Sequence, residues 1–483
     1  MPGENPSSRT KALTAGWLLI LLVLLATACQ VEEPQPTPTP TRTPILPTAT
    51  PTLTPTPTPT PTPTVTPTPT PTLPPDLLLP PQAAQPEGWP PLPTDLYFLR
   101  DGRLWSWLAE GGALEAIPIA EDVADEDVLA YRVTPDKRTI AYVTASGKLY
   151  VFDRAQWQHA AIPTAGWLSD AGRIYIDITP DARYLVYMAW GMQSTAPATP
   201  EEAPAQPFGT VLAVDLADPR QPQIELGFCK TVADRPCTGL QLSPDGANIA
   251  YADGEGIWIS QFIRPEAQLL LPYSEGAVWQ PYAWSPDAQW LVLEAWNNEG
   301  NEMAMLNNVT GQFNPLADIV TCGAGCQTNL SWETPGGVWL STETDQEGCL
   351  TRVQPATVST PITATYRTCQ IGPWALHPTA PLALPDGSVA FAHHGCGEDC
   401  PGPAPGIYIL GLDDVTHPIA LLAQTQGNVL WTADGSAFLT LDPAGQPASL
   451  GVTGSAGFWD VRQILAGAHT FHWGALTIPQ PDE

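Results

Sequence analysis

The densest group of metal-ligating side chains in the sequence is segment 393–400, which reads His-His-Gly-Cys-Gly-Glu-Asp-Cys. Two imidazoles and two thiolates form a ligand set that zinc accepts. The spacing matches no common zinc module, and two cysteines this close together favour a disulfide-closed loop in oxidising surroundings. His393 and His394 therefore remain weak zinc candidates, and the sequence predicts no metal and no other cofactor.

Segment 121–127 is a second cluster of potential ligands, with the sequence Glu-Asp-Val-Ala-Asp-Glu-Asp. Carboxylate oxygens are the ligands that calcium prefers. The segment lacks the glycine and the alternating ligands of an EF-hand loop. A solvated connector is the favoured interpretation.

Six aspartates recur within a short motif, and each could be taken for a catalytic acid: Asp136, Asp181, Asp245, Asp287, Asp386 and Asp434. The best copy of the motif, residues 243–246, reads Ser-Pro-Asp-Gly. This order suits a type I turn, with Ser first, Pro second and Gly fourth. We interpret the six aspartates as structural turn residues and expect no catalytic residue among them.

Motifs for nucleophilic or nucleotide chemistry are missing from the sequence. There is no Gly-x-Ser-x-Gly, and residues 454–457 have the wrong spacing for it. No glycine-rich phosphate loop or dinucleotide fingerprint is found. The chain has 49 acidic and 19 basic residues, a net charge of −30, which makes nucleic acid a poor partner. These features favour binding over catalysis.

Apart from Cys29, the chain has an even number of cysteines, which favours disulfides in an exported protein. Proximity along the chain suggests four pairs: Cys229–Cys237, Cys322–Cys326, Cys349–Cys369 and Cys396–Cys400. Eight cysteines permit about 105 connectivities, so this pairing is a hypothesis. A Cys349–Cys369 bridge would clamp a hairpin.

The elements that carry these residues repeat along the chain. Each turn motif precedes an alternating apolar strand, as in Asn248-Ile249-Ala250-Tyr251. Seven copies from residue 135 to residue 433 are spaced by 45, 64, 42, 49, 50 and 48 residues. A period of about 40–50 residues built from short strands predicts an all-β β-propeller with one four-stranded blade per repeat.

The two ends of the repeat region suggest how the ring closes. Segments 96–99 and 104–107 resemble second and third strands without a first strand, and segment 470–473 resembles a lone first strand. Pairing of these segments would leave no open sheet edge. This count predicts eight blades, and the degenerate copies near residues 335 and 385 leave seven as the alternative.

The motif also carries a family resemblance. The Ser-Pro-Asp-Gly turn at 243–246, the Ile-Ala-Tyr strand at 249–251 and the Ile-Trp-Ile strand at 257–259 resemble the WD40-like repeats of TolB-type propellers. The resemblance implies propeller architecture for residues 94–478, followed by a short tail at 479–483. It implies no activity, because this repeat occurs in unrelated roles.

Residues 1–28 have the features of an export signal, with Arg9 and Lys11 before an apolar run and small residues before Cys29. This arrangement resembles a bacterial lipoprotein signal, which implies a diacylglyceryl group on Cys29. An ordinary cleaved signal and an uncleaved anchor are the alternatives. Residues 29–93 are rich in Thr-Pro units, which cannot form helix or sheet, and predict a disordered linker.

Together these features predict a monomeric, extracytoplasmic propeller, lipid-anchored at the membrane, that binds a protein or glycan of the cell envelope. Two alternatives remain open. One is a propeller-type glycoside hydrolase or lyase, which would need paired carboxylates in the central channel. The other is a structural scaffold of an envelope complex.

Overall fold

The computed structural model describes residues 91–109, 112–164, 166–170, 173–192, 207–218, 220–230, 237–273, 278–297, 300–316, 327–333, 336–343, 348–356, 361–371, 374–395, 405–411, 419–423, 428–442, 444–452 and 458–474. All of them belong to one compact unit, residues 71–483. The predicted signal, Cys29, most of the predicted linker and the tail lie outside the described residues, so those expectations stay predictions.

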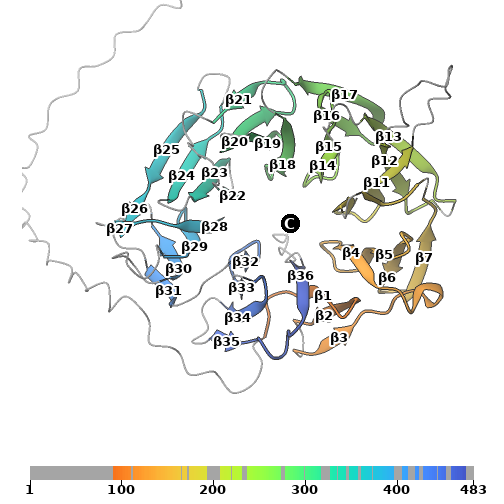
Figure 1. Cartoon of the computed structure of the whole chain (residues 1–483), viewed down its shortest axis with the longest axis horizontal. Helices are drawn as coiled ribbons and strands as arrows, with labels where there is room; N and C mark the ends of the chain where they lie inside the picture. The colour runs from red at the N-terminus through yellow and green to blue at the C-terminus, as the bar shows by residue number, and fades with distance from the viewer. Residues whose placement is uncertain are drawn as a thin grey trace, which may run out of the picture. The chain divides into compact units, whose positions relative to one another are not determined.

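Eight four-stranded antiparallel sheets are arranged in a ring, with the first strand of each sheet nearest the centre (Figure 1). The protein is an eight-bladed β-propeller. The prediction of eight blades is confirmed, and the alternative of seven is wrong. Two short ribbons, β8–β9 and β26–β27, accompany the blades.

The strands of the first four blades follow the chain order, apart from the strand that closes the ring. Blade 1 contains β36 (Ala468–Trp473), β1 (Leu96–Arg100), β2 (Arg103–Trp107) and β3 (Leu114–Ala116). A 3-10 turn, η2 (Glu121–Val123), leads to blade 2, which contains β4 (Val128–Val133), β5 (Thr139–Thr144), β6 (Leu149–Asp153) and β7 (Gln158–Ile162). The ribbon of β8 (Ser169–Asp170) and β9 (Arg173–Ile174) precedes blade 3, which contains β10 (Ile176–Ile178), β11 (Tyr184–Met192), β12 (Pro207–Asp215) and β13 (Gln223–Lys230). Blade 4 contains β14 (Thr238–Leu242), β15 (Asn248–Ala252), β16 (Gly256–Gln261) and β17 (Arg264–Pro272).

The remaining four blades have the same order from the centre outward. Blade 5 contains β18 (Trp279–Trp284), β19 (Trp290–Asn297), β20 (Gly300–Asn307) and β21 (Phe313–Pro315). Blade 6 contains β22 (Gln327–Glu333), β23 (Gly337–Glu343), β24 (Gly348–Gln354) and β25 (Thr363–Thr368). The ribbon of β26 (Gln370–Ile371) and β27 (Trp374–Ala375) precedes blade 7, which contains β28 (Pro378–Ala383), β29 (Val389–His393), β30 (Gly406–Leu410) and β31 (Ile419–Ala423). Blade 8 contains β32 (Val429–Trp431), β33 (Ala437–Leu441), β34 (Pro447–Val452) and β35 (Phe458–Asp460).

The two ends of the described chain meet in blade 1. Strand β36 pairs antiparallel with β1, with Leu96 opposite Trp473 and Arg100 opposite Ala468. The expected pairing of the last segment with the opening blade is therefore confirmed. Closure of this kind stabilises the ring because it removes the exposed sheet edge that an incomplete first blade would present.

The apolar core lies between the blades. The buried apolar side chains of the described residues form eight clusters, one for each contact between neighbouring blades. Successive side chains of a strand point to opposite faces of its sheet. In β5, Tyr142 packs toward blade 1 and Ala141 toward blade 3, so the whole strand is buried.

The repeat turns are held by a recurring side-chain network. In blade 4, the Ser243 hydroxyl donates to Asp245 Oδ1 (2.5 Å) and accepts from the Asn248 amide (2.9 Å), while Asp245 also accepts from the Ala247 amide (3.0 Å). The fourth residue is left-handed, as at Gly246 (φ +71°), and in other blades the same conformation is imposed on Lys137 and Ala182. Glycine was expected at this position, but the network holds other residues there as well.

Tryptophans at the ends of three first strands connect neighbouring blades. Trp284 Nε1 donates to the Gln241 carbonyl (3.2 Å), Trp431 Nε1 to the Ala380 carbonyl (2.8 Å) and Trp473 Nε1 to the Leu430 carbonyl (3.1 Å). Each bond joins the first strand of one blade to the first strand of the preceding blade. This linking role, together with interblade packing, accounts for part of the high tryptophan content.

Candidate binding site in the central channel

A cavity of about 560 Å³ occupies the central channel. Its wall is formed mainly by the first strands of six blades, β4, β18, β22, β28, β32 and β36, which lie around the centre in Figure 1. Because antiparallel strand order brings one strand of every blade to the axis, residues distant in the sequence meet here. The ring therefore assembles a single site from many repeats.

One sector of the wall is aromatic, formed by Trp431 of blade 8 and by Phe471 and Trp473 of the neighbouring blade 1. A fourth aromatic residue, Tyr282 of blade 5, lines the cavity farther round the ring. The interblade hydrogen bonds of Trp431 and Trp473 hold these indoles in place, and the Tyr282 hydroxyl donates to the Thr328 carbonyl at 3.3 Å. Aromatic side chains held in this way offer a preorganised apolar surface to a ligand.

A charged pair lies next to this aromatic sector, on the first strands of blades 2 and 3. Arg132 on β4 lies 4.0 Å from Asp177 on β10, and their side chains are 46% and 32% exposed. Water reaches His472 from the channel, yet the surrounding protein desolvates the imidazole. This desolvation, assisted by the Arg132 guanidinium, lowers the pKa of His472 to about 4, so the imidazole is neutral at pH 7. Burial raises the pKa of Asp177, and Arg132 partly opposes this effect.

The residues of the described chain that line this cavity include no Asp and no Glu. Uncharged donors and acceptors, such as Asn329 and Ser331 on β22, also line the cavity. Ser331 already accepts a hydrogen bond from the Ala383 amide (3.0 Å). The wall can hold a neutral ligand with an apolar face more readily than it can hold a cation.

The weak zinc candidates lie elsewhere, where blade 6 meets blade 7. His393 Nδ1 accepts from the His377 amide at 3.1 Å, and the His394 ring lies 3.5 Å from Glu343 Oε2 and 3.1 Å from Thr379 Oγ1. No group of three or more His, Cys, Asp or Glu that could hold a metal is found among the described residues. Cys396 and Cys400 lie outside that part of the chain. The two histidines act here as hydrogen-bonding residues of a blade contact.

The acidic segment 121–127 also has internal partners. Asp122 accepts from the Tyr150 hydroxyl (2.6 Å) and from Lys148 (3.2 Å), and Glu126 accepts from the Ser146 amide (3.0 Å). These contacts lower the pKa of both carboxyls, the Tyr150 hydroxyl having the largest effect on Asp122 and the Ser146 side chain on Glu126. The segment connects blade 1 to blade 2 and contacts the β5–β6 turn.

The six recurring aspartates do not converge on a centre. Each lies in the turn after the first strand of its own blade, so the ring distributes them among six blades. Asp136, Asp181, Asp287 and Asp434 accept from the hydroxyl two residues before them, as Asp245 does, and Asp386 accepts from Ser388 instead. Every one of these carboxylates has a partner within its own turn.

Two disulfides are present, Cys229–Cys237 and Cys349–Cys369, and both match pairs suggested by proximity. The first connects β13 of blade 3 to the residue before β14 of blade 4, and the second connects β24 of blade 6 to the residue directly after β25. The other four cysteines, Cys322, Cys326, Cys396 and Cys400, lie outside the described residues.

Sequence reasoning did not select the channel residues. Trp431 directly precedes the first residue of a repeat turn, and Arg132 and Asp177, which lie on first strands but do not line the cavity, each lie two residues before one. Counting backward along each first strand from its turn would have shown which side chains reach the axis. That count requires the closed ring, because only closure makes the first strands the inner ones.

No family model matches this chain, and no curated protein matches it. Solved structures to which it is similar include TolB from Acinetobacter baumannii, with 16% identity over 56% of this chain and 65% of that one and a TM-score of 0.33. A prolyl endopeptidase has 13% identity, coverage of 72% and 55%, and a TM-score of 0.42. An oligogalacturonate lyase in complex with manganese has 12% identity, coverage of 73% and 84%, and a TM-score of 0.42.

The chain therefore spans about two thirds of the TolB chain and about half of the endopeptidase chain. At these identities the likeness concerns the fold alone. Among the described residues, no helix is both long enough and apolar enough to cross a membrane.

Proposed function

We propose that the propeller is an extracytoplasmic binding module that takes a neutral ligand with an apolar face, such as a sugar ring, into the mouth of the central channel. The aromatic sector of the channel carries this proposal. Sugar rings present apolar C–H faces to aromatic side chains and polar groups at their edges. The fixed indoles of Trp431 and Trp473, together with Asn329 in the same cavity wall, offer both kinds of contact.

The proposal is tested with a panel of neutral oligosaccharides, measured by ligand-observed NMR and by calorimetry on the full chain. Asn329→Ala and His472→Gln change the cavity wall without removing an interblade hydrogen bond of tryptophan. Each substitution should lower the affinity for the saccharide about fivefold, because one hydrogen bond worth about 1 kcal/mol is lost. His469→Gln is the matched control, because His469 lies on β36 with His472 but does not line the cavity.

Saccharide binding that survives both wall substitutions would place the ligand outside the channel. Failure of every neutral saccharide to bind would contradict the proposed ligand class. A saccharide whose affinity falls with Asn329→Ala and His472→Gln but not with His469→Gln would support the channel site.

A second candidate function, a hydrolase or lyase acting in the channel, is favoured by one observation. Asp177, with its raised pKa, and His472, with its lowered pKa, come from strands on the same side of the channel, and shifted pKa values of this kind are typical of acid-base residues. Incubation of the same saccharide panel with wild type and Asp177→Asn tests it. Cleavage that Asp177→Asn abolishes without loss of binding would favour the enzyme over the binding module.

We also propose that Cys29 carries the lipid anchor and that residues 29–93 hold the propeller away from the membrane. The signal-like segment before Cys29 supports this proposal. In a bacterial host, Cys29→Ser should move the protein from the membrane to the soluble fraction, and mass spectrometry of the mature N-terminus should find acyl groups only with Cys29. An unmodified Cys29 would contradict the anchor and leave the channel proposal untouched.

A further inference from the structure

A second cavity, of about 430 Å³, lies between blades 3 and 4 and shares no residue with the channel cavity. Its wall comes from β13 of blade 3 and from β15, β16 and β17 of blade 4 with the turn between β15 and β16. Four carboxylates line it: Glu225, Asp253, Glu255 and Glu266. Within the described part of the chain, its lining includes no Lys and no Arg.

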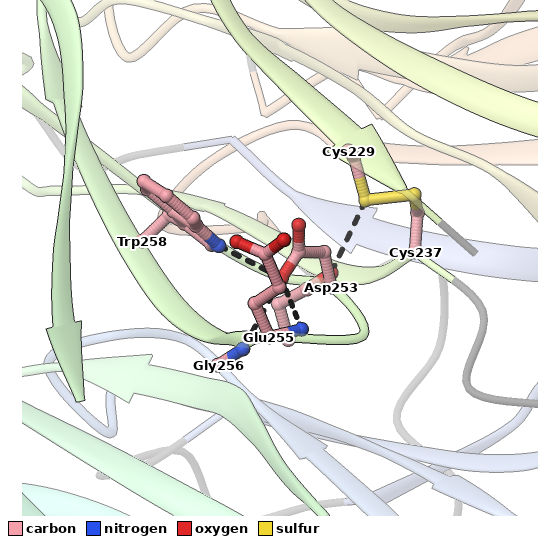
Figure 2. The surroundings of a disulfide bond; sticks show 7 residues. Cys229, Cys237, Asp253, Glu255, Gly256 and Trp258 are labelled. Atoms are coloured by element: carbon pink, nitrogen blue, oxygen red, sulfur yellow. Dashed lines mark hydrogen bonds between the residues drawn. A yellow bond between two sulfur atoms is a disulfide. The ribbon is translucent and has the colours of Figure 1, made fainter. Parts of the chain in front are cut away.

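One of these carboxylates organises an aromatic wall. Asp253 is only 2% exposed, and its Oδ1 accepts from Trp258 Nε1 (2.8 Å), the Glu255 amide (2.7 Å) and the Gly256 amide (3.1 Å). Figure 2 shows the Trp258 indole nitrogen directed at Asp253, beside the Cys229–Cys237 disulfide that links the two blades. The contact fixes the indole in the cavity wall, where Phe228 also lies.

A buried hydroxyl lies in the same wall. Tyr251 is fully buried, and its hydroxyl has no hydrogen-bond partner within the described part of the chain. The hydroxyl lies against Gly227, where a Cβ atom would come within 2.1 Å of the Tyr251 oxygen. Both Tyr251 and Gly227 line the cavity, and glycine at position 227 allows the hydroxyl to lie close to the backbone of β13 at the cavity wall.

Two equivalent tyrosines show that this arrangement is not a general property of the repeat. Tyr142, Tyr187 and Tyr251 each lie eight residues after the first residue of their repeat turn. Tyr142 accepts from the Ala120 amide (2.8 Å), and Tyr187 donates to the Pro163 carbonyl (3.2 Å). In those two blades the chain segment that enters the blade satisfies the hydroxyl, whereas in blade 4 the acidic cavity lies beside it.

We propose that this cavity binds an organic cation, an ammonium or guanidinium group. The carboxylates would balance its charge, Trp258 and Phe228 would contact it through their aromatic rings, and the Tyr251 hydroxyl would accept a hydrogen bond from its N–H. Such a group could belong to a free amine or to a basic side chain of another protein. The chemistry of recognition is the same in both cases.

The test is calorimetric titration of the full chain at low ionic strength with three probes. Putrescine represents a free amine, Nα-acetyl-lysine amide represents a protein side chain, and 1,4-butanediol is the uncharged control with the length of putrescine. We expect saturable binding of at least one cation and none of the diol. Binding of only one cationic probe identifies the source, and either result supports the site.

Two substitutions connect the binding to this cavity. Glu266→Gln removes one exposed carboxylate, and Tyr251→Phe removes the hydroxyl. Each substitution should lower the affinity for the cation about fivefold, as expected for the loss of one hydrogen bond or charge contact. Tyr251→Phe should not lower the melting temperature, because the hydroxyl has no partner to lose. Tyr187→Phe is the matched control, and it should lower the melting temperature without changing the affinity for the cation.

The proposal is overturned if the diol binds as well as putrescine, if no cation binds, or if both cavity variants bind the cation like the wild type. The last result would mean that the strongly acidic chain attracts cations without a defined site. His472→Gln should leave cation binding unchanged, which separates this cavity from the channel.

Discussion

Blades 5 and 6 each have a hydrogen bond between backbone groups three residues apart at the end of the first strand, but they secure this region in different ways. In blade 5 the Ala288 amide donates to the Ser285 carbonyl (2.9 Å), and in blade 6 the Gly336 amide donates to the Glu333 carbonyl (2.8 Å). The Ser285 hydroxyl then bonds within its own turn, to Asp287 (2.6 Å) and the Trp290 amide (2.9 Å). Glu333 extends instead to Arg352 on the third strand of its blade.

Blade 6 also has a covalent link that blade 5 lacks, because Cys349–Cys369 connects its third strand to the residue directly after its fourth. The comparison indicates that a blade can lose the serine and aspartate of its turn when contacts between its strands replace them. Blade 6 therefore kept the propeller geometry while its sequence motif degenerated. Four predictions test this explanation, in order of expected effect.

The largest effect should come from the covalent link in blade 6. The two cysteines are 20 residues apart, and loop-closure entropy for a loop of this size is worth about 3 kcal/mol. Replacing both Cys349 and Cys369 with alanine should reduce the free energy of unfolding in urea by about that amount. Cys229→Ala with Cys237→Ala, which opens a loop with a separation of 8, is the control and should cost about 2.5 kcal/mol. An unchanged urea midpoint after removal of Cys349–Cys369 would show that blade 6 does not depend on its disulfide.

The ion pair of blade 6 should have the next largest effect. Arg352 Nε donates to Glu333 Oε2 at 2.8 Å, and the Glu333 side chain is only 12% exposed. Glu333→Gln should reduce the free energy of unfolding by about 2 kcal/mol, because a partly buried guanidinium loses its charged partner. Arg220→Ala is the control, since that side chain is 90% exposed and its pair with Asp218 should contribute less than about 0.5 kcal/mol. Equal effects of the two substitutions would contradict the bracing role of Glu333.

The turn of blade 5 should show a smaller effect. Ser285→Ala removes the hydroxyl that joins Asp287 to the Trp290 amide and should cost about 1 kcal/mol in urea unfolding. Ser285→Thr keeps the hydroxyl and should retain most of the stability. If alanine and threonine behave alike, the hydroxyl does not secure the turn.

The smallest effect should appear only in acid. The Thr179 hydroxyl holds the pKa of Asp181 below its ordinary value, and the Ser388 hydroxyl does the same for Asp386. When folding lowers the pKa of a carboxyl, the ionised carboxylate stabilises the folded state. This stabilisation is complete above the pKa of the unfolded chain, about 4, and it is lost as the pH falls through the lower pKa of the folded protein. Asp181→Asn should therefore flatten the loss of stability below about pH 4 relative to wild type, measured as urea midpoints at several pH values. A decline as steep as in the wild type would argue against this linkage.

The sequence was sufficient to predict the architecture because the turn and the strands of each repeat are determined by residues that are close together in the chain. A turn such as Ser243–Gly246 needs only neighbouring residues, and the period between turns sets the size of a blade. The closing strand could be predicted for the same reason, since a lone first strand at 470–473 complements the missing one before residue 96. The degenerate blade 6 was harder to predict, because Glu333 and Arg352 are far apart in the sequence and meet only in the folded sheet.

Only the tertiary structure decided which residues form the two cavities. Tyr282, Trp431 and His472 belong to different repeats, and they line one cavity because closure of the ring places their strands at the axis. Tyr251 looks like Tyr142 and Tyr187 in the sequence, and only the packing of blade 3 against blade 4 leaves its hydroxyl beside carboxylates. Turns depend on contacts between neighbouring residues, whereas these sites depend on contacts between blades, and the repeat pattern does not encode which side chains will face one another across a blade boundary.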